Sequence, residues 1–272
     1  MKFFLMNKGN YIYFRSIHGG MPIIGKGMYG TVLKPDIKHH NDKFISKLFI
    51  LPKGITIEEF TQLETNLNTN DALNRFHLPM IDIDIINKSY NLSELNKEDR
   101  EKYTYIATYE YGGLSLERVI SNPDYNSRIT PFFCLQLFNG FLYLYDGIIH
   151  FSEFRIHHCD IHTGNIVFDL ENPSIMRFID FNPNLPFSDF NMNYVQDIID
   201  LLSMIEEVIR KLLIIFQERK NQRLVIYLQS VIPILEQSYT TLFRDYDINN
   251  IVIIKQTLKN KFSEINSIID DM

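Results

Sequence analysis

The chain has 272 residues, of which 45% are hydrophobic and 22% are charged. These values are ordinary for a globular protein, whereas a disordered chain is poorer in large apolar side chains. A chain of this length can bury one large core or two smaller ones. Its formal net charge of −6 argues against a nucleic-acid partner, because binding along a phosphate backbone needs a clustered excess of Lys and Arg.

The cysteines and the apolar runs indicate the compartment. The sequence contains two cysteines, Cys134 and Cys159, which are too few for a disulfide framework in a chain of this size. The apolar run within residues 1–8 is too short for a secretory signal, and we expect no apolar stretch of about 18 residues that would span a membrane. The expectation is therefore a soluble, cytoplasmic protein without a membrane partner, and its oligomeric state stays open.

In chain order, the part up to about residue 109 has the pattern of an antiparallel sheet, because short β-branched and aromatic runs alternate with Gly, Pro and Asn. One helix interrupts the sheet. Thr56 can cap it, Glu59 can complete a capping box, and apolar residues follow at helical spacing until about residues 68–70. The expected strands cover residues 30–33, 43–51, 80–86 and 103–109.

After Gly112 and Gly113 the pattern changes to long helical periodicity. This pair of glycines is the natural hinge between two lobes, residues 1–111 and residues 112–272. The predicted fold class is α+β, with a small antiparallel sheet lobe that holds one helix and a larger helical lobe. The expected helices cover residues 116–121, 131–145, 194–217, 222–243 and 249–269, and two short strands cover residues 166–168 and 177–179.

A glycine-rich run is the first motif with chemical meaning. Glycines let backbone N–H groups approach phosphate oxygens, because no side chain keeps them apart. A dinucleotide-binding loop has a similar pattern but opens a helix, whereas residues 31–35 continue as a strand that ends at a proline. An ordinary hairpin turn is the simplest alternative. The run, which predicts contacts with a nucleotide, consists of Gly25, Lys26, Gly27, Met28, Tyr29, Gly30, Thr31 and Val32.

Lys47 lies in an apolar strand, where a lysine is expensive to bury unless it meets an anion or a carboxylate. The α- and β-phosphates of ATP would supply that anion, and a solvent-facing position on an alternating strand is the alternative. An acidic residue on the capped helix would orient Lys47. Glu59 and Glu64 both lie at the margin of the apolar stripe of this helix, and we choose Glu59, although a capping role explains it equally well.

A polar, turn-rich segment between an apolar helix and a short strand carries Asp160 and Asn165. This arrangement can aim a carboxylate at a substrate hydroxyl and an amide oxygen at Mg²⁺. Asp180 follows at the end of a buried strand, where a carboxylate needs a cation or hydrogen-bond donors. The three residues predict a phosphoryl-transfer site for ATP and Mg²⁺, with Asp160 as the base and Asn165 and Asp180 as metal ligands.

Two simpler interpretations compete with this site. Asp160 can cap a turn while Asn165 occupies a left-handed backbone position. The histidines within residues 157–162, together with Cys159, suggest a zinc ion, but no second cluster in the sequence completes the usual four ligands. The presence of Asp180 further along the chain favours phosphoryl transfer.

The motifs and their order resemble a eukaryotic-type protein kinase domain of the compact, divergent kind found in large DNA viruses, and the resemblance covers nearly the whole chain. It implies a two-lobe protein-kinase-like fold and an ATP- and Mg²⁺-dependent serine/threonine kinase, whose partner is a protein substrate with a Ser or Thr hydroxyl. It implies that Glu110, Tyr111 and Gly112 meet adenine through backbone groups, with Tyr109 as the gatekeeper. Asp197 would brace the catalytic loop from a buried helix. A viral origin would place the protein in the host cytoplasm or in the virion.

The chain also departs from that family. Cys159 replaces the arginine that grips a phosphorylated activation loop in many kinases, and Asn182 replaces the usual glycine after Asp-Phe. The interval from Asp180 to Asp197 is short and lacks Ala-Pro-Glu, which indicates a reduced peptide-docking platform. Residues 158–165 also resemble the loop of aminoglycoside and choline phosphotransferases, so a small-molecule kinase is the alternative. A pseudokinase scaffold is a third hypothesis, although the lysine, aspartates and asparagine that such a protein would lose are all present.

Overall fold

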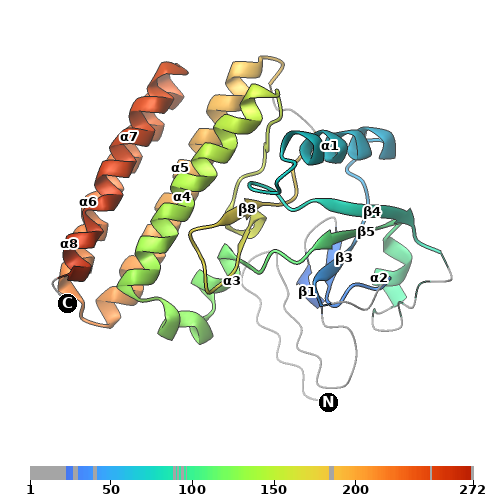
Figure 1. Cartoon of the computed structure of the whole chain (residues 1–272), viewed down its shortest axis with the longest axis horizontal. Helices are drawn as coiled ribbons and strands as arrows, with labels where there is room; N and C mark the ends of the chain where they lie inside the picture. The colour runs from blue at the N-terminus through green and yellow to red at the C-terminus, as the bar shows by residue number, and fades with distance from the viewer. Residues whose placement is uncertain are drawn as a thin grey trace. The chain divides into compact units, whose positions relative to one another are not determined.

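The computed structural model describes residues 23–26, 30–38, 42–87, 90, 92, 95, 97–183, 187–245 and 247–270 (Figure 1). The chain divides into two compact units. The N-terminal unit comprises Met1–Thr69 and Leu78–Tyr111, and the C-terminal unit comprises Asn70–His77 and Gly112–Met272. The fold class is α+β, as predicted, but the sequence did not indicate that residues 70–77 belong with the helical part.

The N-terminal unit is built on an antiparallel sheet of five strands in the order β1-β2-β3-β5-β4. Its central strand β3 places Lys47 opposite Val32 on β2 and opposite Ala107 on β5. The predicted antiparallel sheet is confirmed, and the part of the sheet pattern before residue 23 lies outside the described residues. The strands are β1 (Ile23–Lys26), β2 (Gly30–Leu33), β3 (Phe44–Phe49), β4 (Met80–Ile85) and β5 (Tyr105–Glu110).

The two faces of this sheet bury different sets of side chains. Leu33, Leu48 and Ile106 point to one face, where they join a buried apolar cluster with Leu95 and Tyr103. The short helix α2 (Lys97–Lys102) connects this cluster to β5, so the prediction of a single helix in this part of the chain was wrong. Because side chains alternate along a strand, Lys47 points to the opposite face.

Helix α1 (Ile57–Asn70) packs on that opposite face through Phe60, whose ring centroid lies 5.1 Å from that of Phe49. The helix begins as predicted. The Thr56 N–H donates to Oε2 of Glu59 at 2.8 Å, and the Glu59 N–H donates to Oγ1 of Thr56 at 3.2 Å, which together form a capping box. Leu67 and Glu64 are the buried side chains of α1.

The C-terminal unit is mainly helical, and its long helices pack in the pairs α5 with α6, α4 with α7 and α4 with α5 (Figure 1). A small antiparallel sheet in the order β6-β7-β8 accompanies them. The five predicted helices and the two predicted short strands are found at approximately their predicted places, with the last helix divided in two, whereas strand β6 and the two 3₁₀ segments were not predicted. The elements are β6 (Leu114–Ser115), α3 (Leu116–Ser121), the 3₁₀ helix η1 (Pro123–Arg128), α4 (Pro131–Glu153), the 3₁₀ turn η2 (Thr163–Asn165), β7 (Ile166–Phe168), β8 (Met176–Phe178), α5 (Phe190–Glu218), α6 (Gln222–Asp245), α7 (Asn249–Ser263) and α8 (Ile265–Asp270).

Residues 70–77 are fixed to the C-terminal unit by backbone bonds. The Phe178 N–H of β8 donates to the carbonyl oxygen of Phe76 at 2.8 Å. Asp71 organises the segment, because its carboxylate accepts hydrogen bonds from the backbone N–H groups of residues 75–77 and lies 3.0 Å from Nδ1 of His77. Burial alone raises the pKa of Asp71, but these hydrogen bonds outweigh it and hold the pKa below its ordinary value.

Helix α4 is the core helix of the C-terminal unit. By length and composition it is apolar enough to cross a membrane, so the expectation that no stretch reaches that length was wrong. Its apolar window is 56% buried inside the structure, which is the pattern of a core helix in a folded domain. Phe138, for example, is fully buried and stacks on Phe262 of α7 with ring centroids 4.6 Å apart.

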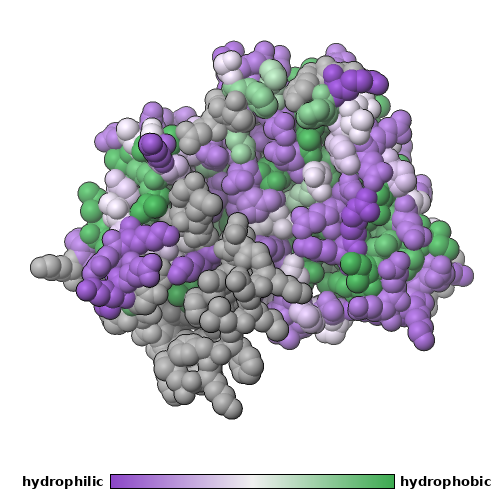
Figure 2. Space-filling model, turned by 180° about the vertical axis from the view of Figure 1, so that it is seen from behind, coloured by the Kyte–Doolittle hydropathy of each residue, from purple (hydrophilic) through white to green (hydrophobic). Residues whose placement is uncertain are grey.

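Several large apolar side chains are exposed on the surface of the described residues. The face in Figure 2 is mostly hydrophilic, with apolar patches between the polar side chains. Val252 and Ile253 of α7 are the most exposed apolar pair of that helix, at 68% and 63%. Single exposed apolar residues of this kind are normal on a folded domain.

Gly140 allows α4 to approach the turn before β8. A Cβ atom at this position would lie 2.5 Å from the carbonyl oxygen of Pro173, which is backbone and cannot rotate away. We therefore predict that Gly140→Ala lowers the free energy of unfolding by about 1–3 kcal/mol through overpacking. Asn139→Ala, at the exposed neighbouring position, is the matched control and should change it by less than about 0.5 kcal/mol. Urea denaturation measures both, and equal effects of the two substitutions would contradict the close approach.

Candidate active site

The glycine-rich run forms the turn between β1 and β2. Gly25 pairs with Val32 and Lys26 pairs with Thr31, so the two ends of the run are hydrogen-bonded strands. Gly27, Met28 and Tyr29, at the tip, lie outside the described residues. Because a strand follows the run, it does not have the strand-to-helix geometry of a dinucleotide-binding loop.

Lys47 reaches toward the β2 end of this hairpin. A Cβ atom at Gly30 would lie 3.5 Å from Cε of Lys47 and 2.8 Å from the carbonyl oxygen of Leu48. A larger residue at Gly30 would therefore clash with the β3 backbone, and its Cβ atom would be in van der Waals contact with the lysine. Lys47 is half-buried, so it is not a fully solvent-facing residue of an alternating strand.

The two acidic candidates on α1 have different environments. Glu59 is exposed, and its carboxylate accepts the backbone N–H of Thr56 in the capping box. Glu64 is 8% exposed, and its Oε1 accepts the hydroxyl of Tyr109 at 3.1 Å. Tyr109 and Ala107 project from the same face of β5, and Ala107 is opposite Lys47, so Glu64 covers the face from which Lys47 projects.

The predicted hinge residues lie at the division between the units. Glu110 pairs with Phe44 at the end of β5 and is exposed, and Gly112 is the first residue of the second part of the chain. Gly113 has a φ angle of 101°, and a Cβ atom there would lie 2.0 Å from the carbonyl oxygen of Phe168. Glycine is therefore required at position 113 both by its backbone conformation and by its contact.

Asp160 and Asn165 are in direct contact. Nδ2 of Asn165 donates to the backbone carbonyl oxygen of Asp160 at 3.0 Å and to Oδ2 of Asp160 at 3.3 Å. The Asp160 side chain is 56% exposed, so its carboxylate is accessible to another molecule, and Nε2 of His162 lies 3.9 Å from its Oδ1. Asn165 is 5% exposed and its amide nitrogen is held, which leaves its amide oxygen as the atom able to bind a cation.

The segment that carries these residues, the His158–Asn165 loop, is held at its start by Asp197 of α5. Oδ2 of Asp197 accepts the backbone N–H of His158 at 2.9 Å, and Oδ1 accepts that of Cys159 at 2.8 Å. Asp197 is 2% exposed. The bracing aspartate that the resemblance implied is therefore present, and both of its oxygens are used by the loop backbone.

The same loop is hydrogen-bonded to the segment that contains Asp180. A ring nitrogen of His158, Nε2, lies 2.9 Å from the carbonyl oxygen of Ile179, and the Asn182 N–H donates to the carbonyl oxygen of His158 at 3.0 Å. The Ile179 N–H donates to the carbonyl oxygen of Asn165, also at 3.0 Å. The structure thus joins the segments of all three predicted C-terminal site residues in one part of the C-terminal unit.

Aromatic side chains pack against the junction between these two segments. Phe181 is 8% exposed, and its ring centroid lies 4.5 Å from that of His158 and 5.3 Å from that of Phe151. The space that these side chains and Asp197 enclose has no room for a water molecule. Water is therefore excluded from the space between these side chains, and electrostatic interactions there are stronger than in water.

Two of the five non-glycine residues that have a positive φ angle among the described residues lie in these two segments. Cys159 and Asp180 have φ angles of 56° and 61°, in the left-handed region that residues with a Cβ atom rarely adopt. Each such residue costs about 1–3 kcal/mol and persists only when its surroundings enforce it. At Cys159 the bond from its N–H to Asp197 is one enforcing contact. Strain of this kind is often found at functional sites.

The loop is surrounded by acidic groups. Burial and the nearby charges of Asp197 and Asp160 raise the pKa of Asp200 to about 6, although a hydrogen bond from Gln196 opposes the shift. Burial, together with the same carboxylates, raises the pKa of the Cys159 thiol to about 12. A thiol with so high a pKa is inert at neutral pH.

The donor set fits Mg²⁺. The candidate ligands are an amide oxygen of Asn165 and a carboxylate of Asp180, which are hard oxygen donors, and Mg²⁺ is commonly held by one or two protein ligands together with substrate phosphates. No group of three or more His, Cys, Asp or Glu side chains is placed to hold a metal within the described residues. Such a group would be needed for a metal site made of protein ligands alone. A Mg²⁺ ion held by two protein ligands and substrate phosphates does not need one.

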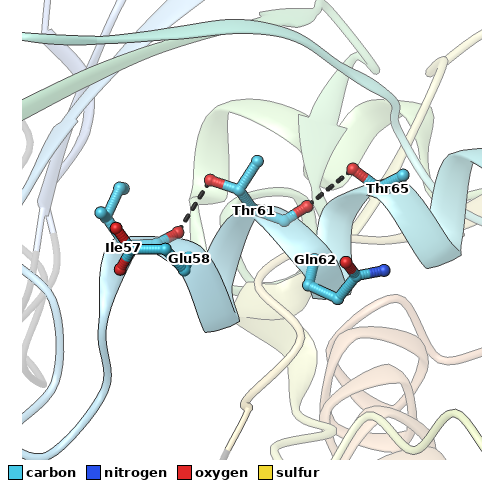
Figure 3. A pocket seen from close by; sticks show the side chains of 5 residues that line it. All are labelled: Ile57, Glu58, Thr61, Gln62 and Thr65. Atoms are coloured by element: carbon cyan, nitrogen blue, oxygen red, sulfur yellow. Dashed lines mark hydrogen bonds between the residues drawn. The ribbon is translucent and has the colours of Figure 1, made fainter.

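A hollow on the surface of α1 does not coincide with these residues. Figure 3 shows that Ile57, Glu58, Thr61, Gln62 and Thr65 line it along one side of the helix. Thr61 Oγ1 donates to the carbonyl oxygen of Ile57, and Thr65 Oγ1 donates to that of Thr61, each at 2.8 Å. The hydroxyl groups of the hollow therefore already bond to their own helix, and none of its residues is a predicted site residue.

Sequence reasoning missed the roles of two buried residues near the loop. His157 lies beside Asp197, and Asn193 holds the chain before α5 by accepting the Phe187 N–H at 3.1 Å. Asp197 lies on a helix far along the chain from His157, and Phe187 lies six residues before Asn193, a spacing that fits no regular motif. No local sequence pattern therefore indicates either contact. Glu64 was considered, but its burial depends on a sheet whose registry the sequence does not state.

The comparisons with known proteins add no family assignment. No protein-family model matches the chain, and no curated protein matches it significantly.

The raised pKa of Asp200 predicts a pH-dependent stability effect. A carboxylate whose pKa is higher in the folded than in the unfolded state destabilises the fold when ionised, so its cost is absent at low pH and grows as the pH rises through about 6. We predict that Asp200→Asn raises the melting temperature at pH 8 and that this gain shrinks at pH 5. Thermal unfolding at both pH values is the measurement. The exposed residue Asp270 provides the control Asp270→Asn, and an Asp200→Asn gain independent of pH would contradict the assignment.

Proposed function

We propose that this chain is an ATP- and Mg²⁺-dependent phosphotransferase with a two-lobe protein-kinase-like fold, most simply a serine/threonine protein kinase. The observation that carries the proposal is the junction in the C-terminal unit. There Asp197 holds the His158–Asn165 loop, and that loop is hydrogen-bonded to the segment of Asp180. An exposed carboxylate beside a fixed amide, next to a second carboxylate segment, suits phosphoryl transfer better than the simple turn-capping interpretation.

In the proposed reaction Asp160 orients the acceptor hydroxyl and accepts its proton. The hydroxyl oxygen forms the bond to the γ-phosphorus of ATP, and the bond from that phosphorus to the β,γ-bridging oxygen breaks, so that ADP leaves. Asn165 and Asp180 would hold Mg²⁺, which when bound offsets the negative charge of the phosphates. The hydrogen bond between Asn165 and Asp160 keeps the base and the metal ligand at a fixed spacing.

The nucleotide side of the proposal rests on the N-terminal unit. The β1–β2 hairpin carries the glycine-rich run, and Lys47 extends toward its end at Gly30, so the proposal assigns the phosphates to this lysine and to the backbone of the run. We assign the orientation of Lys47 to Glu64 rather than to Glu59. Glu64 is buried over the face from which Lys47 projects, whereas the carboxylate of Glu59 is engaged in the capping box.

One observation favours a small-molecule acceptor as the second candidate. Only residues 182–189 connect the Asp-Phe pair at residues 180–181 to α5, which begins at Phe190. This is little chain with which to dock a peptide. Incubating the protein with labelled ATP and Mg²⁺, in parallel with a protein extract and with a pool of small metabolites, separates the two acceptor classes by the fraction that becomes labelled.

A pseudokinase scaffold predicts a different outcome of the same experiment. It would show nucleotide-dependent thermal stabilisation and no label transfer to either pool. The retained Lys47, Asp160, Asn165 and Asp180 argue for catalysis.

Two substitutions test the phosphate and metal contacts. Lys47→Met removes the cation of the sheet, and Asp180→Asn removes a negative charge while keeping a residue type that tolerates the left-handed backbone. Each should reduce the phosphoryl-transfer rate at least about a hundredfold, because each removes charge stabilisation of the phosphates. The melting temperature should stay within a few degrees of the native value. Turnover at the native rate in either variant, with the fold intact, refutes the corresponding role.

The choice between the two glutamates gives a paired test. Glu64→Gln should reduce kcat/KM for ATP about tenfold or more, since Lys47 would lose its charged partner. Glu59→Gln should leave kcat/KM within about twofold and cause at most a small decrease in melting temperature through the capping box. Steady-state kinetics with both variants decide the assignment, and the reverse pattern would restore the original choice of Glu59.

A further inference from the structure

Asp197 carries its charge in an unusual environment. Its carboxylate is buried, no water fits on the side that faces Phe151 and Phe181, and the carboxylate of Asp200 is close enough to interact with it. Two backbone N–H groups bond to it. A buried carboxylate near other carboxylates gains from a further donor, preferably one that can carry positive charge.

His157 is the side chain placed to be that donor. Within the described part of the chain it is the one basic side chain within 4 Å of Asp197, with Nδ1 3.6 Å from Oδ2. Its side chain is 1% exposed, and its ring packs on Phe190 at a centroid distance of 4.6 Å. Both ring nitrogens lack a hydrogen-bond partner among the described residues.

An imidazole always carries at least one N–H, so a buried histidine without a partner leaves a donor unsatisfied. Leaving a buried donor unsatisfied is more costly than forming a bond, which favours closing the remaining distance to Oδ2. A closure of less than 1 Å suffices, because an N–H···O bond is formed at about 2.9 Å. A small rotation of the ring or a small shift of α5 would supply this movement.

We propose that His157 is a positioning residue, which donates its Nδ1–H to Oδ2 of Asp197 and so fixes the carboxylate that holds the His158–Asn165 loop. The bond sets the position of Asp160 indirectly, through Asp197 and the backbone N–H groups of residues 158 and 159. The effect on catalysis rests on the proposed function, whereas the bond itself does not. His157 has no direct contact with the reacting atoms in this scheme.

Two variants with opposite donor properties test the role in turnover. His157→Phe keeps an aromatic ring against Phe190 and removes the donor, whereas His157→Gln keeps an N–H donor. We expect kcat of His157→Phe to fall about tenfold to a hundredfold, the size expected for losing a hydrogen bond to a charged group, with KM for ATP unchanged. His157→Gln should recover most of the loss. His150→Gln, at a histidine of α4 that lies 2.8 Å from the carbonyl oxygen of Asn70, is the control for a histidine outside the loop.

A spectroscopic measurement tests the bond without using activity. In protein labelled with ¹⁵N-histidine, the His157 signals are those absent from His157→Phe or, where that variant does not fold, from His157→Gln. We expect an exchange-protected Nδ1–H resonance, shifted downfield, in the native protein and its loss in Asp197→Asn. The absence of that resonance in the native protein overturns the proposal, as does native kcat in a folded His157→Phe. If the native protein transfers no phosphate but shows the resonance, the proposed function fails while the bond stands.

Discussion

The course of the His158–Asn165 loop depends on one buried carboxylate. Asp197 accepts the backbone N–H groups of His158 and Cys159, and the loop that follows carries the exposed carboxylate of Asp160. A side chain that bonds to backbone fixes the course of the chain, and not merely the orientation of another side chain. The positions of Asp160 and Asn165 therefore follow from where α5 places residue 197.

The left-handed residues show how this restraint is used. Cys159 and Asp180 adopt a backbone conformation that isolated residues avoid, and each occurs in a segment with bonds to the other. The bonds from Ile179 to Asn165 and from Asn182 to His158 oppose relaxation of either segment. Two strained turns that hold each other define one geometry, which the proposed site for a triphosphate and a metal would need.

Much of the fold follows from local sequence, and the exceptions have physical causes. The capping box at Thr56 was readable because both partners are close in sequence. Helix α4 was expected to end at residue 145, but it continues to Glu153, because Gly147 serves there to admit the rings of Phe76 and Phe178 rather than to end the helix. From the sequence alone a glycine suggests that a helix ends, because the side chains that pack against it are not known.

The candidate site divides in the same way. The order of the glycine-rich run, Asp160, Asn165 and Asp180 indicated a chemistry, and the resemblance suggested the brace at Asp197. The preference for Glu59 over Glu64 could not be judged from sequence, since it depends on which carboxylate the sheet covers. His157 was considered only as a possible zinc ligand, because its partner Asp197 lies on a distant helix.

The length of α5 has a mechanical consequence. Residue 197 stands near the start of a helix of 29 residues whose remainder packs against α6. Because α5 is one continuous helix, a tilt of its packed C-terminal part also moves residue 197. Loosening the contact between α5 and α6 would displace the loop before the surrounding core unfolds, so the proposed activity should be lost at a lower temperature than the fold.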